Sequence, residues 1–204
     1  MISKIKTQLT IVSPLKGEAA DSQAVREIRK MVIDICRQNR GGHGGSAIGM
    51  APLTVALWKY TTRYNPQNSE WFDRVRFVLF KGHAAMLLYT MLHVSGYPHV
   101  AADELKLYRN AKAVDRETGN WQATICHGHL EIEVPGVEVT TGPLGQGVAN
   151  AVGLAIASKN LAASFNKPDM DLISSHIYCV TGDGCLQEGV ANKAIVMLSQ
   201  VIWG

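Results

Sequence analysis

The chain has 204 residues and is 47% hydrophobic, which is enough to bury the core of one domain. Its net charge of +3 comes without a basic run, so we expect no nucleic-acid partner. The four cysteines show no CxxC spacing, which disfavours a zinc site or a disulfide framework and favours a reducing compartment. No stretch is long and apolar enough to cross a bilayer, so we expect no membrane partner. We therefore predict an intracellular protein with a loose leader over residues 1–20 and one domain over 21–204.

The predicted elements alternate between helices and short apolar strands. Helical spacing or helix-compatible composition predicts helices over 21–39, 46–64, 84–95 and 145–165, a short one ending between 105 and 109, and a last one from about Leu186. Short apolar runs predict buried strands at 76–80 and 177–181. Asp21 or Ser22 is the predicted N-cap of the first helix, and the polar segment 110–123 is predicted to be an exposed loop. This alternation predicts an α/β fold with a parallel sheet flanked by helices, whose sites form at the carboxyl ends of the strands.

The segment 178–189, YCVTGDGCLQEG, joins the second predicted strand to the last helix through Gly182-Asp183-Gly184. Glycine lets the backbone approach a ligand closely, a helix start offers unpaired N–H groups, and an aspartate can hold a metal ion against phosphate oxygens. The pattern therefore fits a site for an anionic group. A tight strand-to-helix turn without a ligand is the alternative, and the motif alone does not decide between them.

Three histidines stand beside glycine: His43 in GGHGG, His83 in KGHAA and His129 in CHGHLE. Flanking glycine leaves an imidazole uncrowded, which suits a group that donates a hydrogen bond or moves a proton near neutral pH. The other histidines are interpreted as surface or structural residues: His93, His99, His127 and His176. Between His129 and the GDG turn, the segment 137–147, VEVTTGPLGQG, predicts an irregular loop before a helix, with a plain helix-capping loop as the alternative.

Taken together, these segments resemble the amino-terminal part of transketolases and of their relative dihydroxyacetone synthase. The similar stretches are GGHGGSAIG, RFVLFKGHA, GHLEIEVPGVEVTTGPLGQGVANAVGLAIA, NLAASFNKP and GDGCLQEG. They follow the family's order from about Ala24 to about Ile195. The resemblance implies a thiamin diphosphate-binding fold and the diphosphate-binding half of an enzyme that transfers a two-carbon ketol unit between sugar phosphates. Such enzymes normally work as homodimers.

The resemblance also implies how the cofactor is held. Asp183 would ligate the Mg²⁺ or Ca²⁺ ion that bridges the cofactor diphosphate, because hard cations prefer oxygen ligands. Gly182 and Gly184 would border the diphosphate, with the Gly184 N–H touching a phosphate oxygen. Gly142 and Leu144 match positions that meet the aminopyrimidine ring, one through its carbonyl and one through apolar contact.

Four further residues match positions near the chemistry. The resemblance places His43, His83 and His129 facing the reactive carbon, where they hold substrate oxygens and help to move protons, and His83 also reaches the diphosphate. Glu188 matches a glutamate in the carboxylate network that links the two active sites of the dimer. An ordinary helix-surface acid is the alternative interpretation of Glu188.

The chain also departs from the family pattern. It has 43–45, His-Gly-Gly, and 129–131, His-Leu-Glu, where the family usually has HPG and HPE, and the loss of two prolines is expected to loosen these loops. Phe80 replaces a serine and is expected to add bulk beside the His83 turn. The segment from 109 to 129 is longer than in the family by about ten residues. Glycine in the third GDG position favours a transketolase, whereas GGHGGSAIG favours a dihydroxyacetone synthase, so both remain open.

In the family a second side-chain ligand of the metal follows the GDG turn by roughly thirty residues, beyond Gly204 of this chain. We therefore expect a truncated transketolase-type sequence whose activity belongs to the full-length enzyme. A non-catalytic remnant that binds the cofactor weakly or pairs with related subunits is the alternative, and a split enzyme is a third interpretation. The expected compartment is the cytoplasm, with the peroxisome open because its address would stand at a carboxyl terminus.

Overall fold

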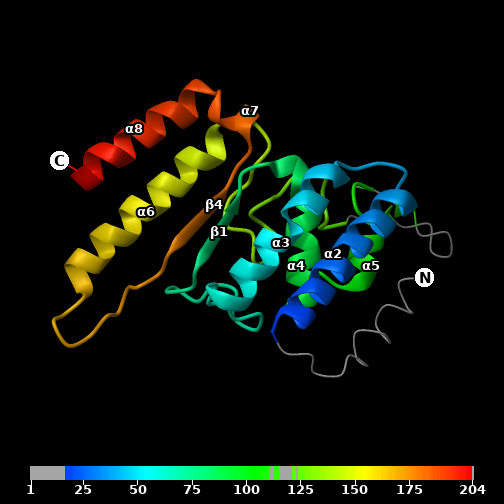
Figure 1. The fold of residues 1–204 in the computed structure, drawn as a ribbon, viewed down its shortest axis with the longest axis horizontal. Helices are drawn as coiled ribbons and strands as arrows, with labels where there is room; N and C mark the ends of the chain where they lie inside the picture. Colours follow the sequence, from blue (N-terminus) through cyan, green and yellow to red (C-terminus); the bar gives the residue numbers. More distant parts are fainter. Residues whose placement is uncertain (1–16, 111–112, 115–120, 123, 204) are drawn as a thin grey trace. The chain divides into compact units, whose positions relative to one another are not determined.

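The computed structural model describes residues 17–110, 113–114, 121–122 and 124–203 (Figure 1). They divide into two units. The first unit takes the chain up to Thr61 and again Met86–Gly128, and the second takes Thr62–Ala85 and everything from His129 on. Of the predicted leader, residues 1–16 lie outside the described residues, and 18–20 are already helical.

The first unit is built mainly from helices. These are α2 (Glu18–Gln38), α3 (Gly44–Tyr60), α4 (Ala85–Val94) from its second residue on, and α5 (Ala102–Lys106). α2 and α3 pack against each other. The residues that α2 buries recur at helical spacing, as its amphipathic sequence predicts: Ile28, Met31, Val32 and Ile35. Tyr89 on α4 meets Tyr108 edge to face, with ring centroids 6.4 Å apart.

The start of α2 differs from the prediction. Gly17, with φ of 71°, is the N-cap, and no side chain caps the helix. Asp21 and Ser22 are therefore wrong as caps. The Asp21 carboxylate instead accepts a hydrogen bond from the Tyr60 hydroxyl on α3 and forms an ion pair with Lys59, and the hydrogen bond from Lys59 lowers the pKa of Asp21. Because Gly17 adopts a positive φ, the helix already starts at Glu18. Asp21 therefore lies within α2, where its carboxylate links α2 to α3.

Two other predictions in the first unit need correction. α3 begins at Gly44, so the second half of the glycine loop forms its first turn, and it ends at Tyr60 instead of Tyr64. The predicted loop 110–123 contains a short antiparallel strand pair, β2 (Ala113–Val114) with β3 (Trp121–Gln122). Residues 111–112, 115–120 and 123 of that loop lie outside the described residues.

The second unit contains the parallel sheet. Its elements are β1 (Arg76–Leu79), the 3-10 turn η1 (Gly82–Ala84), α6 (Gln146–Phe165), β4 (Ile177–Val180), α7 (Asp183–Leu186) and α8 (Gly189–Trp203). β1 and β4 pair in parallel with Arg76 opposite Ile177. α6 packs on both strands, and α8 packs along α6 (Figure 1). The predicted α/β fold with a parallel sheet beside helices is confirmed.

The Phe80 carbonyl accepts the Gly82 N–H at the start of the His83 turn, but the Phe80 ring points into the core of the second unit. Its ring is fully buried in a cluster with Val148, Cys185 and Ala191. Gly147 at the start of α6 touches the ring so closely that a Cβ there would lie 3.1 Å from Cε2 and closer still to Cδ2. The added bulk of the Phe80 side chain therefore lies in the core, because Phe80 directly follows β1 and its ring packs under α6.

Parts of the second unit carry exposed apolar side chains. α8 exposes Val190, Ile195, Val196 and Met197, and α6 exposes Leu161 and Phe165. Cys185 of the second unit and Cys126 of the first are buried, and burial raises the pKa of Cys126 to about 12. Within the described part of the chain, no helix is long and apolar enough to cross a membrane.

Candidate functional site

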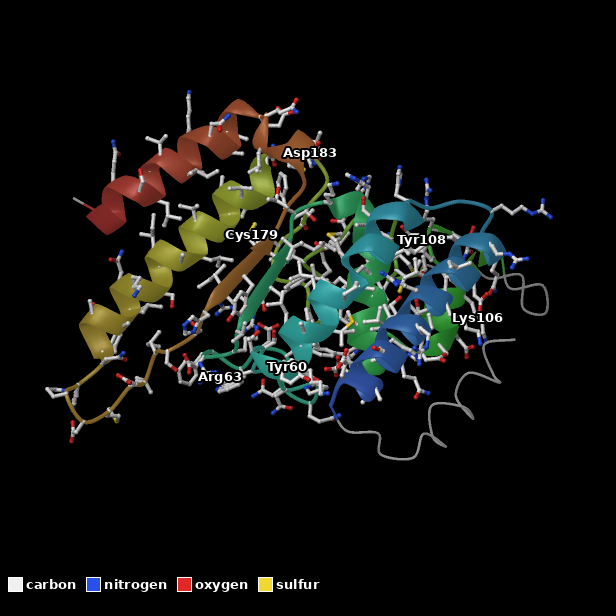
Figure 2. The ribbon with its side chains drawn as sticks, in the orientation of Figure 1. Tyr60, Arg63, Lys106, Tyr108, Cys179 and Asp183 are labelled. Atoms are coloured by element: carbon white, nitrogen blue, oxygen red, sulfur yellow. The ribbon has the colours of Figure 1, made fainter. Side chains whose placement is uncertain are left out.

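The GDG segment forms the turn between β4 and α7. Gly182 has extended backbone geometry, and its carbonyl accepts hydrogen bonds from the N–H groups of Cys185 at 3.1 Å and Leu186 at 3.4 Å. Asp183 begins α7 and is exposed (Figure 2), and so is Gly184. No atom lies within 4 Å of where a Cβ on Gly184 would stand. The predicted strand, turn and helix are therefore present, and the turn is open on the side of Asp183 and Gly184.

A second segment of the site, the loop 137–147, is fixed to the end of β1. The buried Thr141 hydroxyl donates a hydrogen bond of 3.0 Å to the Leu79 carbonyl. A Cβ on Gly82 would collide with the Thr141 carbonyl carbon, 2.5 Å away, so only glycine fits at the start of the His83 turn. The His83 turn and the loop before α6 are thereby held in direct contact.

Charged groups hold the beginning of the same loop. Glu138 is almost completely buried and accepts hydrogen bonds from Arg74 at 2.7 and 2.9 Å and from Arg76 at 2.8 Å. A buried carboxylate paired by two guanidinium groups is well compensated. The loop is therefore anchored by charge at one end and by Thr141 in its middle.

His129 lies against this loop. A Cβ on Gly142 would stand 3.6 Å from both Cγ and Cδ2 of the His129 ring, so the imidazole rests beside the glycine backbone. The next residue, Leu130, accepts the Thr141 N–H at 3.1 Å, which fixes the approach of the two segments. His129 is exposed, as is Leu144 two residues beyond Gly142. One predicted cofactor position, Gly142, and one predicted histidine, His129, are thus in direct contact.

Glu188 lies between α7 and α8, so the predicted last helix is divided and its long part begins at Gly189. The Glu188 carbonyl accepts the Asn192 N–H at 3.2 Å, which makes Glu188 the residue that starts α8. A Cβ on Gly145 would stand only 2.6 Å from the Glu188 Cβ, and Gly145 has a φ of 89°. The half-buried Glu188 therefore packs its Cβ on the end of the loop 137–147.

Lys81 is a site residue that the sequence analysis missed. It follows Phe80 and precedes the His83 turn, and its side chain lies across Gly182 in the GDG turn. Its Nζ is 2.5 Å and its Cδ 3.2 Å from where a Cβ on Gly182 would stand. The available signal was its position directly after a strand and next to Gly82-His83. Its reach to the GDG turn depends on the parallel pairing of β1 with β4.

His43 belongs to the first unit, whereas the other predicted site residues belong to the second. It is exposed and forms the N-cap of α3. The preceding Gly42 has a φ of 124°, and a Cβ there would stand 2.9 Å from the Cys36 Sγ and 3.3 Å from Tyr108 Cε1. Glycine is thus required before His43 both by conformation and by space.

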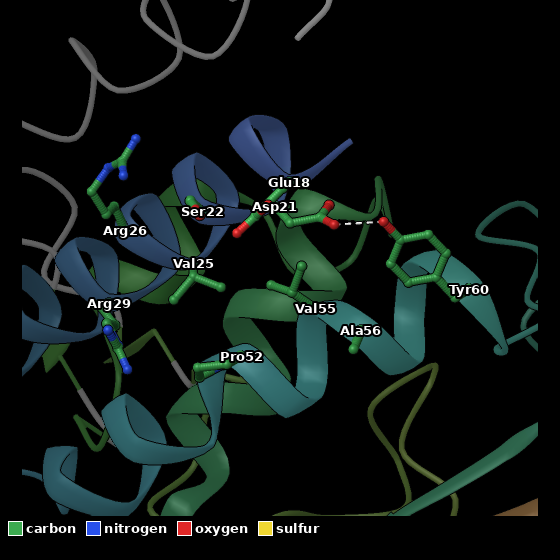
Figure 3. Close-up of a pocket in the computed structure, with 10 residues that line it drawn as sticks. All are labelled: Glu18, Asp21, Ser22, Val25, Arg26, Arg29, Pro52, Val55, Ala56 and Tyr60. Carbon is green, nitrogen blue, oxygen red and sulfur yellow. Dashed lines mark hydrogen bonds between the residues drawn. The ribbon is translucent and has the colours of Figure 1, made fainter. Parts of the chain in front are cut away.

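Two further features bear on ligands. Among the residues that the structure describes, no three His, Cys, Asp or Glu side chains gather as a metal site, so Asp183 would need phosphate oxygens and water to complete the coordination of an ion. An open groove between α2 and α3 lies in the first unit and includes Asp21, Pro52 and Tyr60 in its lining (Figure 3). None of the predicted site residues lines this groove.

The sequence profile described as "Transketolase, thiamine diphosphate binding domain" matches residues 20–202. The chain belongs to the transketolase family. It is 44% identical to the chloroplastic transketolase-1 of Arabidopsis thaliana over 194 residues, which is 95% of this chain and 24% of the relative. It is 46% identical to the dihydroxyacetone synthase of Pichia angusta over 185 residues, which is 89% of this chain and 25% of that protein. The match of the profile confirms the predicted family.

Solved structures of the transketolase family agree with the fold. A transketolase from Leishmania mexicana matches with a TM-score of 0.79 at 42% identity, over 87% of this chain and 25% of the other. A Pichia stipitis transketolase in complex with sedoheptulose 7-phosphate matches with a TM-score of 0.76, also at 42% identity, over 87% of this chain and 24% of the other. The chain thus spans about a quarter of the length of the relatives it matches.

Proposed function

We propose that the chain binds thiamin diphosphate together with Mg²⁺ or Ca²⁺, as the diphosphate-binding part of an enzyme that transfers a two-carbon ketol unit between sugar phosphates. One observation carries this proposal. In the second unit the GDG turn, the loop 137–147, the His83 turn and His129 are joined by direct contacts at the carboxyl ends of two parallel strands. This edge is where ligands bind in open α/β sheets.

The residues present fit the diphosphate end of the cofactor. Asp183 offers an exposed carboxylate to a hard cation, and Gly184 leaves the space beside it open. Gly182 presents its backbone without a side chain. The exposed Leu144 offers apolar contact to a ring, while Gly142 offers a carbonyl on a loop fixed by Thr141.

The bound cofactor would supply the carbanion chemistry that breaks and forms the carbon–carbon bond. The chain's own residues would orient the reactants and handle protons. His129 beside Gly142 and His83 on the adjoining turn would hold substrate oxygens by hydrogen bonds and exchange protons near neutral pH. Glu188 would join a carboxylate network with the partner subunit of a homodimer. The role that the resemblance implies for His43 in holding substrate remains a prediction.

The partners and setting follow from the same proposal. Sugar phosphates would be the substrates, the pentose phosphate pathway the setting, and the cytoplasm or the peroxisome the compartment. We further propose that the 204-residue chain alone does not transfer ketol units. A non-catalytic protein that binds the cofactor weakly or pairs with related subunits is the alternative. The observation that favours it is that, in the described residues, Asp183 belongs to no group of three metal-ligating side chains.

Calorimetric titration with thiamin diphosphate, with and without Mg²⁺, tests the proposal. We expect saturable binding that Mg²⁺ strengthens, and loss of the Mg²⁺ effect in Asp183→Asn. Asp169→Asn removes another exposed carboxylate from the same unit and should bind as the unchanged chain does. Absence of saturable binding by the unchanged chain would refute the proposed function. Ketol transfer by the purified chain would contradict only the proposal that it is inactive alone.

A further inference from the structure

Lys81 stands where the two strand ends of the second unit meet. Phe80, just before it, donates its N–H to the Val180 carbonyl at 3.0 Å, and the Lys81 carbonyl accepts the Ala84 N–H at 2.7 Å. The backbone on both sides of Lys81 is therefore fixed, one side by the sheet and the other by the His83 turn. From this position the half-buried side chain crosses to Gly182, at the end of the neighbouring strand.

The ammonium group is held at the GDG turn without a protein partner among the described residues. No hydrogen bond or ion pair joins Lys81 to any of them, although Asp183 is the next residue after Gly182. An ammonium has three donors and no acceptor, so an anion is the ligand that suits it. The side chain is thus already extended over the turn, and it keeps its donors for something outside the protein.

We propose that Lys81 is a diphosphate-binding residue, whose ammonium contacts the phosphate oxygens of thiamin diphosphate beside the ion held by Asp183. This inference rests on the proposed function, since it assumes that the cofactor binds at the GDG turn. Asp183 adds a negative charge to a site that binds an anion. Lys81, at the carboxyl end of the neighbouring strand, offsets that negative charge. The lysine also explains why position 182 lacks a side chain, because a Cβ there would occupy the space of Lys81 Cε and Nζ.

Titration of the full chain with three probes tests the role of Lys81: thiamin diphosphate, inorganic diphosphate and thiamin, each with Mg²⁺. Lys81→Met should weaken binding of the first two probes by about tenfold or more, as expected for a lost hydrogen bond to a charged group, and leave thiamin unaffected. Lys159→Met is the matched control. It removes the same charge from an exposed position on α6, 13 residues after Gln146 and hence roughly 20 Å along the helix, and should change nothing.

A double-mutant cycle of Lys81→Met with Gly182→Ala tests whether Lys81 binds the diphosphate by direct contact of its side chain. Gly182 has extended geometry that alanine adopts readily, so the added methyl group acts mainly by displacing Lys81. Gly182→Ala should weaken diphosphate binding in the unchanged chain and have little effect in Lys81→Met. Unchanged affinity in Lys81→Met, or equal effects of Gly182→Ala in both backgrounds, would overturn the role of Lys81 while the proposed function stands. No saturable binding by the unchanged chain would overturn both.

Discussion

The contact between Gly147 and Phe80 allows a direct test of how the second unit is packed. The Phe80 ring is completely buried, and a Cβ on Gly147 would lie 3.1 Å from its Cε2 and 3.2 Å from its Cγ. Because Val148, Cys185 and Ala191 surround the ring, it has no room to turn away. Gly147→Ala should therefore destabilise the second unit by about 1–3 kcal/mol, the usual overpacking cost, because Gly147 is only the second residue of α6 and gains little from helix propensity.

Removing the ring reverses the expected sign. Phe80→Ala should cost about 3–5 kcal/mol, as for other buried phenylalanines. In that background Gly147→Ala no longer meets the ring, so it should be neutral or stabilising, with a coupling free energy of about 1–3 kcal/mol between the two positions. Gly153→Ala on the same helix is the control. No atom lies within 4 Å of its Cβ position, so it should stabilise by about 0.5–1 kcal/mol in both backgrounds.

The assay must report on the second unit alone, because the chain forms two units and a global melting curve mixes them. Urea-dependent hydrogen exchange of the amides of β1 and β4 gives that local free energy of opening. If Gly147→Ala has the same cost with and without the Phe80 ring, or no cost in the unchanged chain, the close packing of glycine on the ring is wrong.

Three further predictions concern charge and exposed surface. Burial alone would raise the pKa of Asp73, but hydrogen bonds from Ser174 and the charge of Arg63 lower this pKa below its ordinary value of 3.8. The ionised Asp73 therefore stabilises the folded chain above that pH, and this contribution is lost as the pH falls through the lowered pKa. Asp73→Asn should cost about 1–3 kcal/mol at pH 7, measured by hydrogen exchange in the second unit, and flatten the loss of stability in acid. An equally steep acid loss would contradict this. Glu138→Ala leaves two arginines without their carboxylate and should cost about 3 kcal/mol by hydrogen exchange, whereas an unchanged loop would show that the ion pairs contribute nothing. The chain should self-associate through the exposed face of α8, and Val196→Glu should reduce its mass in light scattering, which a monodisperse unchanged chain would contradict.

Most of the helices and both strands of the parallel sheet could be predicted from the sequence, because local patterns decide them. The strand before Phe80 and the strand before the GDG turn are short apolar runs, and they pair in parallel as their alternation with helices predicts. The boundaries were less accurate. Asp21 looked like an N-cap, but its contact with α3 depends on a residue 39 positions away, which no local pattern contains.

The motifs of the site and their order can be read directly from the chain: the glycine-flanked histidines, the loop 137–147 and the GDG turn with Asp183. How these motifs contact one another depends on the packing of the folded chain. Parallel pairing of β1 with β4 sends the Phe80 ring under α6 and extends Lys81 across Gly182. Both outcomes depend on which face of a short strand is covered and on the glycines that face it, and these are properties of packing between segments distant in sequence.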